Sequence, residues 1–122
     1  MPLELNHCII NDAVANFLTS VDDALPPFCI ALCDSSGELV YFLKMSHAVK
    51  RASAIAKAKA RTAALMEIST RQLHERLLRE NLTLVDFCHT NLTSIAGGVP
   101  LSLRGKTSAG IGVSGRTPEQ DE

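Results

Sequence analysis

The chain has 122 residues, of which 46% are hydrophobic and 20% charged, and its formal net charge at pH 7 is −1. A chain of this length forms one domain, and this composition excludes an intrinsically disordered protein. It contains no apolar stretch of the roughly 18 residues that indicate a transmembrane helix and no signal peptide, so we expect a cytoplasmic protein that does not bind membranes.

The first third of the chain predicts a helix followed by a β-hairpin. Apolar residues recur at helical spacing over residues 3–21, which indicates an amphipathic helix that ends before Pro26. Two apolar runs, residues 28–33 and 39–43, flank a short turn that contains Gly37. They predict two strands whose faces are both covered.

The middle and the end of the chain predict two helices and three more strands. Residues 47–66 are rich in alanine and predict a helix, and a capping box from Ser69 to Gln72 begins another helix that runs to about Glu80. Apolar runs at residues 92–96, 101–104 and 107–114 predict strands. The order of elements predicts an α+β fold in which helices cover a five-stranded, mainly antiparallel sheet.

Glycine is concentrated near the end of the chain. Six of the seven glycines lie between Gly97 and Gly115, which favours turns at positive φ or close approach of the backbone to another group. Residues 117–120 then carry the signals of a helix start, and two residues follow them. We therefore expect a single domain, residues 1–122, that lacks its C-terminal helix, with residues 116–122 extended, frayed or held by a neighbouring chain.

Several segments resemble the GlcG/HbpS-like family, which carries the label "heme-degrading" and also occurs as the C-terminal domain of PduO-type corrinoid adenosyltransferases. One segment, residues 55–63, matches the family motif I-A-x-x-K-A-x-T-A, and the others are Gly97-Gly98-Val99-Pro100-Leu101, residues 111–115 and residues 119–122. The resemblance runs from Phe28 to Glu122. It implies a profilin-like fold with helices on both faces of the sheet, homo-oligomers from dimer to octamer, and heme or another tetrapyrrole as ligand.

The chain also departs from this family's pattern. The family often reads R-M-D-G-A where residues 44–48 are Lys-Met-Ser-His-Ala, Ala109-Gly110 inverts a usual Gly-Ala pair, and Arg116 stands where glycine is frequent. These changes flank the expected ligand pocket, so they affect the identity of the ligand rather than the fold.

Lys59 is the strongest single-residue candidate for a ligand contact. It lies in the middle of the alanine face of the 47–66 helix, and it coincides with the lysine of the family motif. A lysine on a packed face is costly unless its ammonium meets an anion or reaches water. Three interpretations follow. Lys59 reaches water or a neighbouring subunit, it contacts an anionic group of a ligand, or it is a catalytic amine with a lowered pKa.

The segment Gly97-Gly98-Val99-Pro100 predicts a turn whose backbone N–H groups could bind a carboxylate or phosphate, with a plain hairpin turn as the alternative. Thr62 and Ser114 could add hydroxyl groups at the same place. The expected ligand-binding set is therefore Lys59, Thr62, Gly97, Gly98, Pro100 and Ser114. The G-x-G-x-x-G pattern of residues 110–115 lies in a strand pattern without a βαβ unit, so we interpret it as structural rather than as a dinucleotide site.

Three residues could supply an axial ligand to heme, namely His7, His89 and Cys88, although a histidine of the core or of an interface is the commoner interpretation of His7. The four cysteines, Cys8, Cys29, Cys33 and Cys88, form no C-x-x-C pair. We expect them to be buried free thiols, and we expect no metal site.

The function that these features favour is an oligomeric binding domain for a small anionic ligand, and the resemblance makes heme or another tetrapyrrole the candidate. The alternatives are a small-molecule enzyme of diol, glycerol or glycolate metabolism and an accessory subunit without a ligand of its own. The basic side of the 47–66 helix, formed by Lys50, Lys57 and Arg61, is interpreted as a solvated face or an oligomer contact. It lacks the interleaved aromatic residues that favour nucleic-acid binding.

Overall fold

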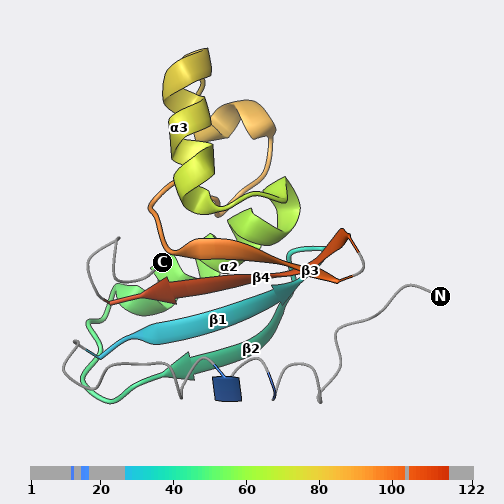
Figure 1. The fold of residues 1–122 in the computed structure, drawn as a ribbon. Coiled ribbons are helices and arrows are strands. Elements are labelled where there is room, and N and C mark those ends of the chain that lie inside the picture. The colour runs from blue at the N-terminus through green and yellow to red at the C-terminus, as the bar shows by residue number, and fades with distance from the viewer. Residues whose placement is uncertain (1–11, 13–14, 17–26, 104, 116–122) are drawn as a thin grey trace.

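The computed structural model describes residues 12, 15–16, 27–103 and 105–115. Its strands are β1 (Cys29–Asp34), β2 (Leu39–Lys44), β3 (Gly98–Leu103) and β4 (Lys106–Ser114). Its helices are α2 (Ala52–Met66), α3 (Thr70–Glu80) and the short 3₁₀ helix η1 (Leu84–Phe87). The strands form one antiparallel sheet in the order β2-β1-β4-β3, and α2 lies across one face of it (Figure 1).

The α+β class is confirmed, but the prediction of five strands is wrong: the described residues form four. Residues 92–96, expected to be a strand, are irregular. The backbone N–H of Thr93 donates to Thr62 Oγ1 at 2.9 Å, and that of Ile95 donates to Thr93 Oγ1 at 3.2 Å. Side-chain hydroxyls therefore take the place of a neighbouring strand for this segment.

The face of the sheet that meets α2 is built from small residues. It presents Cys29, Ala31 and Cys33 of β1, which pack on Ala52, Ala56, Ala60 and Ala64 of α2. A Cβ at Gly110 would meet Ala60 O and would lie 2.6 Å from Ala64 N, and one at Gly112 would meet Ala56 O and would lie 2.6 Å from Ala60 N. The backbones of α2 and β4 thus touch, which accounts for the first two glycines of the G-x-G-x-x-G pattern.

The opposite face of the sheet carries larger apolar side chains, because successive residues of a strand point to opposite sides. Phe28, Ile30, Leu32 and Val113 are buried there, with Tyr41, Leu43, Met45 and Ile111 packed around them. Strand β1 is covered on both faces as predicted. Strand β2 is more open than predicted, since Leu39 is 44% exposed and Val40 40%. The expected helix over residues 3–21 lies largely outside the described residues, of which 12, 15 and 16 are helical.

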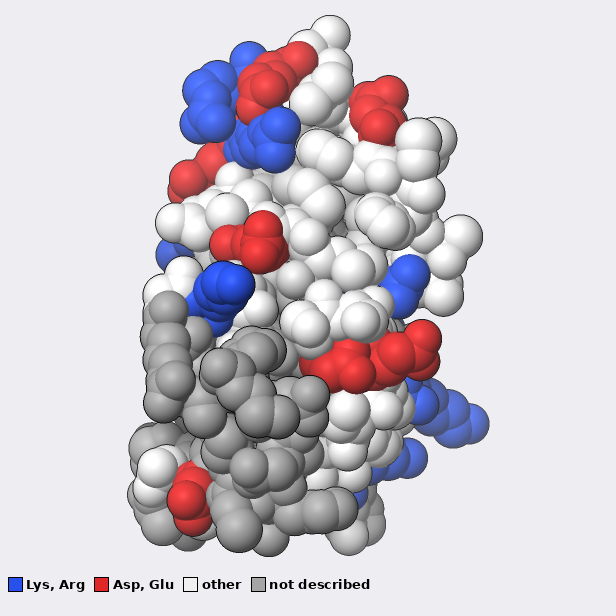
Figure 2. Space-filling model, turned by 90° about the vertical axis from the view of Figure 1, so that its right-hand side faces the viewer, with Lys and Arg blue, Asp and Glu red and all other residues white. Residues whose placement is uncertain are grey.

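Helix α3 begins beside β3, where Thr70 contacts Gly98, and then projects away from the sheet (Figure 1). The predicted capping box is present: Gln72 N donates to Ser69 Oγ at 3.1 Å, and Ser69 N donates to Gln72 Oε1 at 3.2 Å. Of the residues of α3, Thr70 and Leu73 are buried. Arg76 pairs with Glu80 at 2.7 Å and covers the Phe87 ring at 5.3 Å, which holds η1 against α3. Figure 2 shows acidic and basic side chains intermixed at this end of the molecule.

Residues 116–122, where we expect an incomplete helix, lie outside the described part of the chain. None of the helices in the part that is described is long and apolar enough to cross a membrane.

The contact between α2 and β4 leads to the first prediction. Gly112→Ala should lower the free energy of unfolding by about 3 kcal/mol or more, because the added methyl overlaps backbone atoms of α2 that cannot move alone. Gly105→Ala is the matched control: no atom lies within 4 Å of its Cβ position, and its φ of +78° costs about 1–2 kcal/mol for a residue with a side chain. Urea unfolding of both variants measures the difference, and equal losses would contradict the close contact.

Candidate functional site

Lys59 lies between α2 and the sheet, as its place on the alanine face predicts. The residue is 1% exposed, and its Nζ donates a hydrogen bond to the Val113 carbonyl at 2.7 Å. Its backbone carbonyl lies 2.7 Å from the position that a Cβ on Gly98 would take. The ammonium is therefore buried within the domain, next to the N-terminal end of β3 and the C-terminal end of β4.

The Gly97-Gly98 segment is not the turn that we expected. Gly98 is the first residue of β3, its N–H donates to Thr70 Oγ1 at 2.9 Å, and its carbonyl accepts from the same hydroxyl at 3.5 Å. Gly97 has φ of +125°, and its carbonyl accepts the N–H of Val113 at 3.0 Å. Pro100 pairs with Gly110 in the sheet. Gly98 thus lets β3 approach α2, and its N–H already has a partner.

The two candidate hydroxyls lie in different surroundings. Thr62 is buried; its Oγ1 donates to Ala58 O at 2.7 Å and accepts from Thr93 N at 2.9 Å. Ser114 is 5% exposed at the end of β4, where it pairs with Cys29. The structure therefore brings Lys59, Gly98 and Ser114 to one region, whereas the hydroxyl of Thr62 holds the segment around Thr93.

The candidates for a heme axial ligand lie elsewhere. Cys88 and His89 follow η1 and are exposed, so the expectation of a buried thiol is wrong for Cys88, which follows a helix end and adopts φ of +59°. His7 and Cys8 lie outside the described residues. Cys29, Cys33 and Cys88 are free cysteines, as predicted. Within the described ranges no group of three or more metal-ligating side chains gathers.

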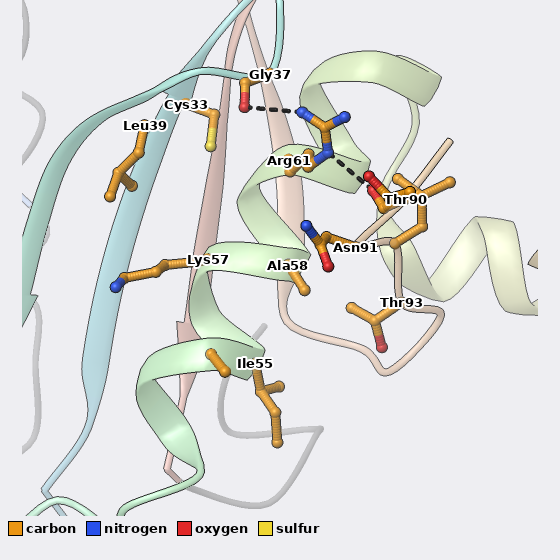
Figure 3. A pocket seen from close by; sticks show the side chains of 12 residues that line it. Cys33, Gly37, Leu39, Ile55, Lys57, Ala58, Arg61, Thr90, Asn91 and Thr93 are labelled. Atoms are coloured by element: carbon orange, nitrogen blue, oxygen red, sulfur yellow. Dashed lines mark hydrogen bonds between the residues drawn. The ribbon is translucent and has the colours of Figure 1, made fainter. Parts of the chain in front are cut away.

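An open cavity of about 730 Å³ lies on the outer side of α2 (Figure 3). Its walls are α2, the turn between β1 and β2, and the irregular segment 90–93. The lining residues are Cys33, Gly37, Leu39, Ala54, Ile55, Lys57, Ala58, Arg61, Thr90, Asn91, Leu92 and Thr93. The volume falls within the range of about 300–1,000 Å³ that is usual for small-molecule sites.

The cavity carries positive charge. Lys57 and Arg61 line it one helical turn apart, and none of the described lining residues is Asp or Glu. Arg61 Nε donates to the Thr90 carbonyl at 3.0 Å, and Nη1 donates to the Gly37 carbonyl at 3.3 Å. Lys57 Nζ lies 4.7 Å from the centroid of the Phe42 ring. The sequence interpretation recognised both cations but assigned them to a solvated face or an oligomer contact; their spacing of four residues on one helix was the available signal.

Cys33 contributes a neutral group to the cavity. Burial, with a smaller contribution from the charge of Asp34, raises the pKa of the Cys33 thiol from 9.0 to about 11. The thiol therefore stays protonated at neutral pH. A protonated thiol is a poor nucleophile and a poor metal ligand, so the cavity is suited to binding rather than to thiolate chemistry.

The raised pKa of Cys33 leads to a prediction about stability. Between pH 9 and about pH 11 the unfolded chain loses a thiol proton that the folded chain keeps, so this contribution to stability is present below pH 9 and disappears toward pH 11. Cys33→Ala removes the effect. The gap in unfolding free energy between the two proteins, measured in urea, should shrink from pH 8 to pH 11; a constant gap would contradict the raised pKa.

Comparisons with known proteins agree with this architecture. The family model described as "Haem degrading protein HbpS-like" matches residues 5–122. A double mutant of HbpS from Streptomyces reticuli is 26% identical, with a TM-score of 0.87 over 100% of this chain and 82% of that chain. The PduOC:heme complex is 23% identical, with a TM-score of 0.79 over 98% of this chain and 88% of that chain. The protein ORFY from Klebsiella pneumoniae is 18% identical, with a TM-score of 0.83 over 99% and 86%.

None of the curated proteins matches the chain. The family model covers nearly its whole length, and the fold is that of the HbpS structures. The chain therefore belongs to the HbpS-like family.

Proposed function

We propose that this protein is a binding domain for a small anionic, largely apolar ligand, with heme or another tetrapyrrole as the first candidate, and that the ligand lies in the cavity beside α2. The observation that carries the proposal is the cavity's composition: two cations, an apolar lining that includes Leu39, Ile55 and Leu92, and no Asp or Glu among the described lining residues. Ligand sites generally combine apolar walls with a few polar groups that orient the ligand.

Relatives favour heme within this class. The family model is described as haem-degrading, and PduOC forms a complex with heme. Heme has an apolar ring and two carboxylate-bearing propionates. The ring suits the apolar lining, and the carboxylates suit Lys57 and Arg61. When bound, heme would supply the redox chemistry of its iron.

The iron needs a ligand that the described lining does not offer in an obvious form. The lining contains no histidine, and its thiol, Cys33, is protonated at neutral pH. We propose His89 first, because it precedes Thr90 of the cavity wall and is exposed. Cys88 and His7 are the other candidates.

A second location for the anion is the region around Lys59. There Lys59, Thr62, Gly97, Gly98, Pro100 and Ser114 form the set that the family motifs suggest. The buried ammonium of Lys59 is the supporting observation. We favour the cavity, because Lys59 already donates to Val113 and the N–H of Gly98 to Thr70.

The alternative function is a small-molecule enzyme, or an accessory subunit, in diol, glycerol or glycolate metabolism. Turnover of such metabolites would favour it over a binding domain. In either case we propose a cytoplasmic homo-oligomer. The buried free thiols of Cys29 and Cys33 support this proposal, because free thiols are usual in a reducing compartment.

Titration with heme tests the function and its location together. Heme should give a saturable change in absorbance with the wild-type protein. Lys57→Gln should weaken binding about 2- to 5-fold, as expected for loss of one exposed ion pair, whereas Lys59→Met should leave it unchanged. Lys50→Gln is the matched control, because Lys50 is exposed and does not line the cavity. Weaker binding in Lys59→Met alone would move the site to Lys59, and no change in absorbance would refute heme.

Light scattering tests the oligomer. The homo-oligomer is what the family resemblance implies, and the alanine face of α2 is not free for it, because that face packs on the chain's own sheet. Association would instead use exposed apolar residues such as Leu78 and Val85, which are 71% and 82% exposed. We expect a mass of at least twice 13.1 kDa at micromolar concentration, reduced in a Leu78→Glu, Val85→Glu double variant. A 13.1 kDa species in the wild type would contradict the proposal.

A further inference from the structure

We propose that the cavity recognises its ligand as a carboxylic acid: Arg61 holds the carboxylate in a bidentate pair, Lys57 adds a second positive charge, and an apolar body lies on the adjoining lining. The inference rests on the binding site proposed above, but it does not require heme or iron. It assigns the ligand class to apolar, in particular aromatic, monocarboxylates and to the carboxylate arms of larger molecules.

The guanidinium of Arg61 has donors left to use. A guanidinium carries five N–H groups in a planar fork. Two of them, on Nε and Nη1, donate to the carbonyls of Thr90 and Gly37, so three remain, on Nη1 and Nη2. Nη1 therefore keeps one donor and Nη2 keeps two, so each of these nitrogens can donate to one oxygen of a carboxylate.

The charge of Arg61 is not neutralised by its partners. Both partners are neutral carbonyl oxygens, and within the described residues its side chain makes no ion pair. Arg61 is half-buried, and the interaction of a cation with an anion strengthens as water is excluded. An anion in the cavity would therefore gain an attraction that nothing in the described lining offsets.

The fork is held in place before a ligand binds. Its two hydrogen bonds reach opposite rims of the cavity, the β1–β2 turn and the segment after η1 (Figure 3). A Cβ at Gly37 would lie 2.8 Å from Nη1, so the guanidinium packs directly on that glycine. On the other rim, Thr62 Oγ1 fixes the backbone of Thr93. Groups fixed in this way lose little entropy when the ligand binds.

The rest of the lining suits an apolar body with one charge. Leu39, Ile55 and Leu92 supply apolar surface, and Asn91 supplies an uncharged polar group. Figure 3 shows Lys57 reaching toward the β2 side of the cavity and Arg61 toward the Gly37 turn. Both cations occupy positions that the motif I-A-x-x-K-A-x-T-A leaves open.

The test compares two probes of the same shape, 2-naphthoate and 2-naphthamide, titrated into the full chain by calorimetry or by ligand-observed NMR. The carboxylate should bind at least tenfold more tightly than the amide at low ionic strength, and its advantage should shrink in salt because the cations are partly exposed. Equal affinities for the two probes, or no binding of the carboxylate, would overturn the inference.

Substitutions at the two cations test whether they are the source of the preference for the carboxylate. Arg61→Lys keeps a positive charge but loses the fork and should reduce the preference for the carboxylate severalfold; Lys57→Gln should reduce it less. Lys50→Gln should leave the preference unchanged. Because Arg61 also holds two cavity rims, circular dichroism must show that the variant is folded, and Lys57→Gln repeats the test at a residue without such hydrogen bonds. A preference that survives both substitutions would overturn the assignment to these side chains.

The heme titration separates this inference from the proposed function. Heme binding together with equal naphthoate and naphthamide affinities would leave the function standing and remove carboxylate recognition. A tenfold preference for naphthoate with no heme binding would leave carboxylate recognition standing and remove heme.

Discussion

The close contact between α2 and the sheet is the constraint on which the rest of the structure depends. The backbone of α2 lies so close to the sheet that there is no room for a Cβ at Gly98 of β3 or at Gly110 and Gly112 of β4. On the helix side of the contact, the residues are the alanines Ala52, Ala56 and Ala60. Small residues on both sides bring the two backbones together. Such a contact gains dispersion energy from many atoms and tolerates little change in volume.

This contact fixes the rotation of α2 and so decides where its cations go. Residues two apart on a helix point about 200° away from each other. With the alanine face against the sheet, Lys59 is turned inward to the Val113 carbonyl, whereas Lys57 and Arg61 are turned outward. One helix thus carries a buried lysine with an internal partner and an outer pair of cations beside a cavity.

The outer wall of that cavity exists because residues 90–93 do not pair as a strand. Arg61 and Thr62, neighbours on α2, hold this segment through the Thr90 carbonyl and the Thr93 N–H. A strand there would have placed those groups in the sheet. Side-chain hydrogen bonds instead fold the segment back on the helix, and the space between them, Gly37 and Leu39 becomes the cavity.

The sequence by itself determined the local elements. The apolar runs gave β1 and β4, the alanine face gave α2 with Lys59 on its buried side, the capping box gave the start of α3, and the motifs gave the family. These features depend on the period of a helix or strand or on nearby backbone groups, which are visible in neighbouring residues.

Only the tertiary structure decided which groups far apart in the sequence contact each other. The partners of Gly98 and Thr62 are Thr70 and Thr93, 28 and 31 positions away, and the cavity joins three separate segments. Periodicity contains no information about such contacts. Residues 92–96 were therefore predicted as an additional strand, although residues 92 and 93 line the cavity, and the Gly97-Gly98 pair was predicted as a turn, although β3 begins at Gly98.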